Sequence, residues 1–312
     1  RPVENGFSSL MKSLQSGACG PGILYYITFI PNNGAVAVNL LTTGNPKILK
    51  GTEQGYLTSI LHLAPANLSG YNVCPSASAG CRSACLNTAG RGGMIKVGET
   101  TNVIQQSRIR KTQFFFENRT AFLTQLAKEI RSAIRLAEAH NLIPAFRLNG
   151  TSDIRWENYG IIEQFPTVQF YDYTKLPNRR NLPSNYHLTF SRSESNEHYV
   201  PMAFDNGMNV AVVFRKDGAK VKRVYTLAEQ LANKEKRERQ LANRDPNRPK
   251  KPYVPRKVDL SWVPSTYYGK NVFHGDNSDL RFLDPKNSVV ALLAKGEAKY
   301  DVSGFIVDIH TK

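Results

Sequence analysis

Three of the four cysteines of this chain lie close together in one polar loop. Cys74, Cys81 and Cys85 have the spacing C-x6-C-x3-C, and the residues around them are mostly Ser, Gly and Ala. The loop has no apolar periodicity, so burial of these cysteines as small hydrophobic residues is not expected. Thiolates are the ligands that soft metals prefer. The cluster therefore predicts a metal site on these three cysteines.

The spacing leaves the identity of the metal open. An iron–sulfur cluster, such as a 4Fe-4S cluster, held by three cysteines keeps one iron free to bind a ligand that is not protein. Zinc commonly takes four ligands, often from paired C-x2-C elements. The chain lacks that pairing, although Cys19 or His62 could complete a zinc site. Free thiols or a redox disulfide are the alternative in which no metal binds.

Polar residues follow several short apolar runs, at the points where predicted strands end. Carboxylates gathered there could hold divalent cations and polarise a phosphodiester, which is the chemistry of a metal-dependent nuclease. The alternative for any single Asp is a helix cap or an ion pair with Arg147, Arg192 or Arg281. We take as catalytic candidates Asp153, Asp172, Lys175 and Asp276, and as cofactor-binding candidates Asn149, Gly150, Thr151, Ser152 and Ser191.

Short runs rich in β-branched and aromatic residues have the length of buried strands. Helical patterns lie between several of them, the clearest at 119–140, where apolar residues recur at spacings of three and four. Strands that alternate with helices predict crossover connections and a mostly parallel sheet. The predicted strands lie at 56–64, 145–148, 168–171, 186–190, 209–214, 271–274, 289–294 and 305–309, and weaker helices at 156–165 and 195–204.

Eight predicted strands favour an α/β fold that forms a complete or partial (β/α) barrel, with a doubly wound open α/β sheet as the alternative. Two further apolar runs, at 23–30 and 35–41, are separated by the turn residues Pro-Asn-Asn-Gly and predict an N-terminal β-hairpin. We therefore expect an extension at 1–50 and one barrel-like domain at 51–312. The polar strand ends would gather on one face, where active sites of such folds are built.

The formal charge of +16 on these 312 residues is concentrated in one segment. Residues 215–257 contain fifteen Lys or Arg against five Asp or Glu, a surplus of +10. The segment holds a predicted helix at 226–242 and then a proline-rich stretch. It is either a solvated insertion or an arm that contacts the phosphates of a nucleic acid. The residues expected at such a contact are Arg237, Arg239, Arg244, Arg248, Lys250 and Lys251.

Composition excludes several classes of protein. With 41% hydrophobic residues and four cysteines, the chain is not a collagen, a coiled coil, a disulfide-stapled miniprotein or a wholly disordered chain. No window approaches the ~18 consecutive apolar residues of a membrane span, and no signal peptide opens the sequence. We expect a soluble, intracellular protein with no membrane partner.

The position of the cysteine loop carries a fold-level resemblance. A three-cysteine loop directly after the first strand of a (β/α) barrel resembles the arrangement in radical S-adenosylmethionine enzymes, whose cluster binds the methionyl part of that cofactor through its open iron. The usual spacing there is C-x3-C-x2-C, from which this chain departs. The resemblance implies S-adenosylmethionine as a cofactor, with Asn149-Gly150-Thr151 standing where its amino group binds.

Several phrases of the sequence together resemble the phage gene product 88 domain family. They include 72–75 (NVCP), 84–91 (ACLNTAGR), 147–154 (RLNGTSDI) and 279–285 (DLRFLDP). The resemblance runs in order from Leu40 to Ile309. It implies an origin in a bacteriophage or mobile element and a location in the host cytoplasm, and it supplies no reaction.

Three functional hypotheses follow from these residues. The leading one is a phage metalloprotein with an iron–sulfur cluster on the three clustered cysteines, of the radical S-adenosylmethionine type, acting on nucleic acid or nucleotides. The second is a non-catalytic DNA- or RNA-binding protein with a structural metal, in which the basic arm provides the affinity. The third is a divalent-metal-dependent nuclease that uses the carboxylates at the strand ends.

Overall fold

The computed structural model describes residues 39–43, 51–96, 98–245 and 259–310. Most of the predicted N-terminal hairpin lies outside the described residues, and so do Cys19, Arg248, Lys250 and Lys251. The end of the second hairpin run forms β1 (Leu41–Thr42). This strand pairs antiparallel with β2 (Tyr56–Leu61), at one edge of the main sheet.

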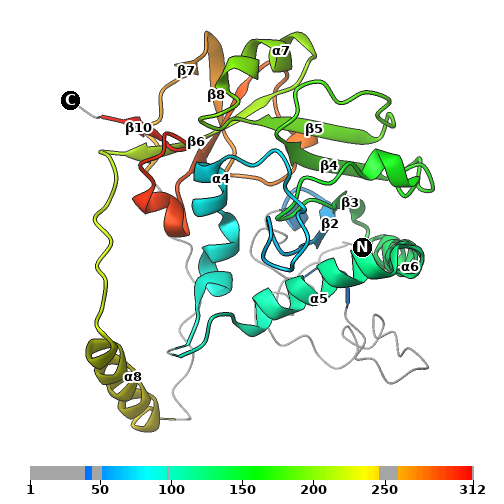
Figure 1. Cartoon of the computed structure of the whole chain (residues 1–312). Helices are drawn as coiled ribbons and strands as arrows, with labels where there is room; N and C mark the ends of the chain where they lie inside the picture. Colours follow the sequence, from blue (N-terminus) through cyan, green and yellow to red (C-terminus); the bar gives the residue numbers. More distant parts are fainter. Residues whose placement is uncertain (1–38, 44–50, 97, 246–258, 311–312) are drawn as a thin grey trace, which may run out of the picture.

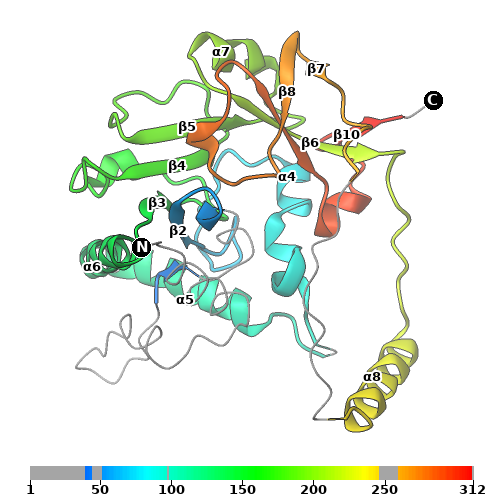
Figure 2. The ribbon, with the colours of Figure 1, turned by 180° about the vertical axis from the view of Figure 1, so that it is seen from behind.

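Ten strands of the described chain form one sheet, and its central strands are all parallel (Figures 1 and 2). The remaining strands are β3 (Ile143–Arg147), β4 (Gln169–Thr174), β5 (Tyr186–Ser191), β6 (Val210–Lys216), β7 (Thr266–Tyr267), β8 (Lys270–His274), β9 (Val289–Leu293) and β10 (Val307–Ile309). From β2 to β6 neighbours follow chain order, and β9 and then β8 lie beyond β6. β7 pairs antiparallel with β8, and β10 pairs with the end of β6.

The eight predicted strands are all present, which confirms the α/β class and the mostly parallel sheet. From β2 to β6, strands that are consecutive in the chain are neighbours in the sheet, as in a barrel. Beyond β6 the spatial order runs against the chain order, with β9 before β8, as in an open sheet. No ladder joins β7 to β1 within the described residues, so closure into a complete barrel is not shown. The described ladders form an open sheet.

The helices cover one face of the sheet or lie in its connections. They are α4 (Ala79–Ser83), α5 (Val103–Glu117), α6 (Arg119–Ala139), α7 (Val200–Asp205) and α8 (Leu227–Ala242), with single 3-10 turns η2 (Leu86–Thr88), η3 (Gly90–Gly93), η4 (Trp156–Tyr159), η5 (Glu197–Tyr199), η6 (Arg281–Leu283) and η7 (Gly296–Tyr300). The clear helical prediction at 119–140 is confirmed by α6. The weaker prediction at 156–165 was too long, because the chain leaves the η4 turn at Gly160, whose φ is 64°.

The main hydrophobic core lies between α6 and the sheet. Phe122, Leu126 and Ile130 recur at helical spacing along α6 and are fully buried. They form one cluster with Phe146 of β3 and Phe170 of β4. Burial of each such apolar side chain contributes roughly 1.5–3 kcal/mol to the stability of the fold. These contacts therefore hold α6 against the sheet.

The opposite face of the sheet, which we call the inner face, is more polar. Because side chains alternate along a strand, Arg147 of β3 points there, away from the core under α6. Its guanidinium pairs with Asp279 at 3.2 Å. The Phe282 ring lies 5.3 Å from the ring of Tyr171 on β4. The segment 278–284, between β8 and β9, thus crosses the inner face and ties the two halves of the sheet together.

A basic arm leaves the end of β6 and carries α8 away from the sheet (Figures 1 and 2). Thr226 caps this helix, since its hydroxyl accepts from Glu229 N and its own N–H donates to the Glu229 carboxylate at 2.8 Å. No residue of α8 is buried. The predicted helix at 226–242 is therefore confirmed, and it is exposed on all sides within the described chain. None of the described helices is long and apolar enough to cross a membrane.

Candidate functional site

The cysteine loop follows β2 and lies at the carboxyl edge of the parallel strands. Cys74 stands in the loop itself, Cys81 lies on the short helix α4, and Cys85 is the residue that caps η2. All three are free thiols and are partly buried. The structure therefore brings together, on one segment, the three cysteines that the sequence predicts as metal ligands.

A carboxylate from β5 holds the part of the loop that carries Cys81. Glu194, three residues after the end of β5, accepts hydrogen bonds from Gly80 N and from the Ser78 hydroxyl, both at 2.8 Å. The Ser78 hydroxyl in turn accepts from Cys81 N at 3.1 Å. A Cβ on Gly80 would lie 2.0 Å from Ser303 Oγ, so only glycine fits there. The loop is thus fixed to the sheet immediately before its second cysteine.

Burial, with smaller contributions from the charges of Cys85, Cys81 and Asp153, raises the pKa of Cys74 to about 12. Burial also raises the pKa of Cys85, and Cys81 adds to that effect. Because burial favours the neutral thiols of Cys74 and Cys85, a positive charge nearby would favour their ionisation.

Lys175 supplies a positive charge beside Cys81. Its buried ammonium donates to the Ser191 hydroxyl at 2.9 Å and to the carbonyl oxygens of Ser191 and Arg192 at 3.0 and 3.2 Å. It also lies 4.9 Å from the ring centroid of Phe305. Burial lowers the pKa of Lys175, and the negative charge of Cys81 is the largest opposing effect. Two predicted residues, Lys175 and Ser191, therefore meet at the edge of the cysteine loop.

The donor set of three thiols fits a soft metal centre, but the ligands do not converge on one point. Among the described residues, no group of three or more His, Cys, Asp or Glu side chains could hold a single metal ion. His62, one of the two candidates for a fourth zinc ligand, directly follows β2. Its ring packs closely against Gly150, since a Cβ added to Gly150 would lie 2.8 Å from that ring. Cys19 lies outside the described residues.

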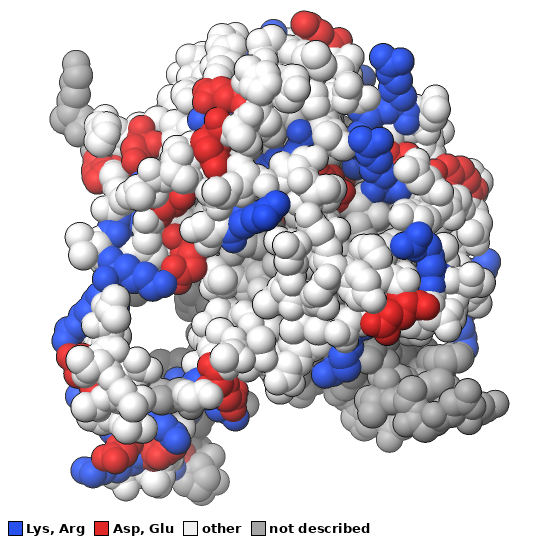
Figure 3. Space-filling model, viewed as in Figure 1, with Lys and Arg blue, Asp and Glu red and all other residues white. Residues whose placement is uncertain are grey.

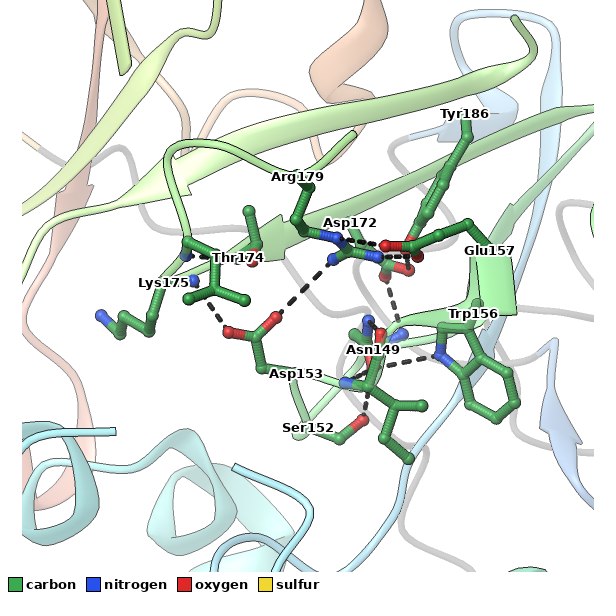
Figure 4. A network of polar contacts seen from close by, with 12 residues as sticks. Asn149, Ser152, Asp153, Trp156, Glu157, Asp172, Thr174, Lys175, Arg179 and Tyr186 are labelled. Carbon is green, nitrogen blue, oxygen red and sulfur yellow. Dashed lines mark hydrogen bonds and ion pairs between the residues drawn. The ribbon is translucent and has the colours of Figure 1, made fainter. Parts of the chain in front are cut away.

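A network of polar contacts at the ends of β3 and β4, which we call the Asp172 network, contains most of the other predicted residues (Figure 4). Asp172 has no exposed surface. Its carboxylate accepts from Asn149 N at 2.7 Å and from the Tyr186 hydroxyl at 2.8 Å. Burial raises the pKa of Asp172 to about 7, while the hydrogen bond from Asn149 opposes that shift. Lys175 points away from it (Figure 4), so this carboxylate and ammonium do not form a pair.

The predicted cofactor-binding residues of this region bond to the chain itself. Asn149 Oδ1 accepts from the Ser152 hydroxyl at 2.8 Å, from Ile154 N and from the Trp156 indole. Gly150 N donates to Leu61 O, and the Thr151 hydroxyl donates to Leu63 O. These hydrogen bonds build the loop after β3 and anchor it beside the cysteine loop, where Cys74 Sγ lies 3.7 Å from Thr151 O.

Asp153 connects the Asp172 network to an ion-pair cluster that the sequence did not indicate. Its carboxylate accepts from Lys175 N at 2.8 Å and lies 3.8 Å from the Arg179 guanidinium. Arg179 also donates to Glu157 at 2.9 Å. Burial raises the pKa of Asp153. Nothing in the sequence distinguishes Arg179 from its neighbour Arg180, so this ion pair could not be predicted. The role of Ser78 could have been predicted, because serine is a common helix cap.

Asp276 stands apart from the other catalytic candidates. It follows β8, where its carboxylate accepts from Leu293 N at 2.8 Å and pairs with Lys295. These partners belong to the end of β9, whereas Asp153 accepts from Lys175 N after β4 and Asp172 from Asn149 N after β3. Among the described residues, the three candidate carboxylates form no group that could hold a metal ion.

The candidate nucleic-acid residues lie on the arm. Arg237 and Arg239 are exposed on α8, and Arg244 follows it. Figure 3 shows the arm at the lower left with mixed Lys, Arg, Asp and Glu, whereas the centre of that face, over the cysteine loop, is mostly uncharged. Arg239 pairs with Glu235 at 3.8 Å on the surface. The arm and the cysteine loop thus present different chemistry.

Comparison with known proteins gives one match. The family model described as gene product 88 matches residues 39–309. No curated protein and no solved structure matches the chain. The matched range includes every described strand and the whole cysteine loop.

Proposed function

The chain belongs to the phage-associated gene product 88 family, and on that premise we propose that Cys74, Cys81 and Cys85 hold an iron–sulfur cluster that acts on nucleic acid or nucleotides. The observation that supports the proposal is the cysteine loop itself. Three partly buried thiols lie on one loop at the carboxyl edge of a mostly parallel sheet, and the buried Lys175 ammonium lies against Phe305, in whose cluster Cys81 packs. This edge is where ligand sites of α/β folds are found.

We propose a cluster in preference to a single ion because the two centres place different demands on the thiols. A zinc ion needs its ligands within ~2.3 Å of one point, so zinc-binding thiols converge closely. A cluster binds each cysteine through a different iron and therefore accepts thiols that lie farther apart. Among the described residues, no group of three or more His, Cys, Asp or Glu side chains could hold a single metal ion.

The residues around the loop fit an anionic centre. Thiolate ligands carry negative charge, and the ammonium of Lys175 lies beside Cys81 to offset it. The carboxylate of Glu194 holds the loop through backbone and hydroxyl groups. A cluster held by three cysteines supplies an open iron that binds a non-protein ligand and exchanges electrons. The thiols need a reducing compartment, which accords with the host cytoplasm.

S-adenosylmethionine is the ligand that the resemblance to radical enzymes suggests for such an iron, on a partial (β/α) barrel. Asn149, Gly150, Thr151 and Ser152 lie next to Cys74 through the contact of Cys74 with Thr151. Their described polar atoms bond within the chain, so binding there requires the loop after β3 to rearrange. A change in the electron paramagnetic resonance spectrum of the reduced cluster on addition of S-adenosylmethionine would support this cofactor, and an unchanged spectrum would oppose it.

Serine variants test the assignment of the ligands. We expect anaerobically purified Cys74→Ser, Cys81→Ser and Cys85→Ser each to lose the sulfide-to-iron absorption of the parent chain, because oxygen replaces a soft ligand. Cys19→Ser is the matched control and should keep the absorption. Retention of the absorption in all three loop variants would overturn the proposal, and its loss in Cys19→Ser would make Cys19 a fourth ligand.

The exposed arm favours a second candidate function, nucleic-acid binding without catalysis. No residue of α8 is buried, and no ion pair within the described residues involves Lys234, Lys236 or Arg237. Such cations are available to phosphates, and binding through them falls steeply with salt. Deletion of 243–257 should weaken binding to DNA or RNA, while Asp172→Asn should leave it unchanged. Unchanged binding after the deletion would count against this candidate.

The nuclease hypothesis has less support. Its carboxylates bond to backbone groups and cations of the chain, and Asp276 stands apart from Asp153 and Asp172. Cleavage stimulated by Mg²⁺ and abolished by Asp276→Ala would nevertheless establish it. Absence of cleavage in the parent chain would remove it.

A further inference from the structure

Two cations at the root of the arm each lie over a tyrosine ring, one from the root and one from η7, and neither proposed function uses these rings. The Arg223 guanidinium lies 4.7 Å from the ring centroid of Tyr225, and the Lys222 ammonium lies 5.8 Å from that of Tyr300. Tyr225 is 44% exposed. The extended residues 219–225 bury no side chain against the sheet. The extended segment therefore carries one exposed ring with cations beside it, and the half-buried ring of Tyr300 on η7 adds a second.

This root is attached to η7. Lys220 N donates to Lys299 O at 2.9 Å, and the Lys222 ammonium pairs with Glu297 at 2.6 Å. The contacts fix the position of the root relative to the sheet, unlike α8 beyond it. We call the root residues and η7 together the tyrosine strip, consisting of 219–225 and Gly296–Tyr300.

The tyrosine strip leads to the cysteine loop. A Cβ on Gly296 would lie 3.0 Å from Ala89 Cα and 3.1 Å from Thr88 O, so η7 touches the chain that follows Cys85. In both Figure 1 and Figure 2, η7 lies between the arm and α4. Lys299 and Arg91 add exposed cations at the two ends of this contact. A partner bound along the strip would reach the thiols.

We propose that the tyrosine strip binds single-stranded nucleic acid and directs it to the cysteine loop. Cations that follow a backbone, interleaved with rings on which bases stack, are the pattern of single-strand binding. A duplex keeps its bases stacked on one another and offers phosphates alone. The destination of the strand rests on the proposed function of the thiols, whereas binding to the strip does not.

Fluorescence anisotropy with a labelled single-stranded oligonucleotide and the matching duplex tests the binding. We expect Tyr225→Ala and Tyr300→Ala each to weaken single-strand binding roughly tenfold, the loss of one stacked base, with little change for the duplex. Tyr225→Phe should keep the affinity because its ring still stacks. Tyr199→Ala, which removes a ring of similar exposure on η5, is the control.

Equal single-strand affinity for Tyr225→Ala and the parent chain would overturn the inference, as would equal losses for strand and duplex. The same measurement on the chain in which the three loop cysteines are serine separates the two proposals. Tight single-strand binding by that chain supports the strip whatever the metal content. Loss of binding only when the cysteines are replaced would show that the thiols, and not the strip, hold the strand.

Discussion

The Asp172 network and the cysteine loop lie at the same edge of the sheet but differ in how their polar groups are used. In the network, Asp172 accepts two hydrogen bonds at 2.7 and 2.8 Å, and Asn149 accepts three. In the cysteine loop, Cys74 Sγ donates to Thr151 O at 3.7 Å and Cys85 Sγ accepts from Asn87 N at 3.5 Å, and a thiol is only a weak donor and acceptor. Buried polar groups are normally satisfied, as the network shows.

This difference distinguishes residues that support the fold from residues that are available for chemistry. A carboxylate that accepts a buried hydrogen bond on each oxygen organises the loops around it, whereas buried thiols with weak partners can exchange a proton for a metal. We infer that the network supports the edge of the sheet and that the cysteine loop carries the chemistry. The catalytic roles that the sequence suggested for Asp172 and Asp153 stay predictions, which this inference does not use.

Removal of the Asp172 carboxylate should have the largest effect on stability. Asp172→Ala leaves Asn149 N and the Tyr186 hydroxyl buried without their acceptor, which costs about 4 kcal/mol of unfolding free energy. Denaturant unfolding measures the loss, and Asp205→Ala, an exposed change, is the control. Iron content per folded chain should stay constant. A loss of iron with no loss of stability would place Asp172 in the functional site instead.

The pH dependence of stability should follow from the same carboxyl group. Its pKa is raised to about 7 in the folded chain, whereas in the unfolded chain it is about 3.9. Between these values the folded state holds the proton more tightly, so stability falls as pH rises. The difference between the parent chain and Asp172→Asn should change by about 2–3 kcal/mol between pH 5 and pH 7. An equal pH dependence in both chains would contradict the assignment.

A methyl group on Gly80 should disturb the cysteine loop while sparing the network. The added Cβ would meet Ser303 Oγ at 2.0 Å and Phe305 Cβ at 2.7 Å. We expect Gly80→Ala to cost about 2 kcal/mol and to lower the iron content, because the helix that carries Cys81 must move. Ser83→Ala, exposed on the same helix, should do neither. Full iron content in Gly80→Ala would show that α4 need not be held in place.

The arm should contribute least to stability. Lys236→Ala and Arg237→Ala alter exposed residues and should change the unfolding free energy by less than about 0.5 kcal/mol. If each contacts a phosphate, each should reduce the slope of log affinity against log salt by about one. An unchanged slope with unchanged stability would make these cations a solvated surface.

The strands and the long helix could be predicted from the sequence because their patterns are local. The apolar recurrence along 119–140 and the short apolar runs depend on nearest neighbours, and α6 and the eight strands match them. The three-cysteine spacing likewise marked a loop that the structure holds together. Local sequence patterns were therefore sufficient to predict most of the strands of the sheet.

The partners of the polar residues could not be predicted, because they come from distant parts of the chain. Glu194 meets Gly80 across 114 positions, and Arg147 meets Asp279 across 132. Asp172 and Lys175 are three residues apart in sequence, yet their side chains go to different neighbours. Two catalytic candidates that lie close together at one strand end are thus separated by the fold.

Iron, acid-labile sulfide and zinc measured on one anaerobically purified sample of the whole chain test the central claim most directly. If the cysteine loop holds a 4Fe-4S cluster, the iron and sulfide contents should be equal, at about four of each per chain, and the zinc content should be far below one per chain. One zinc per chain, or no metal at all, would contradict it.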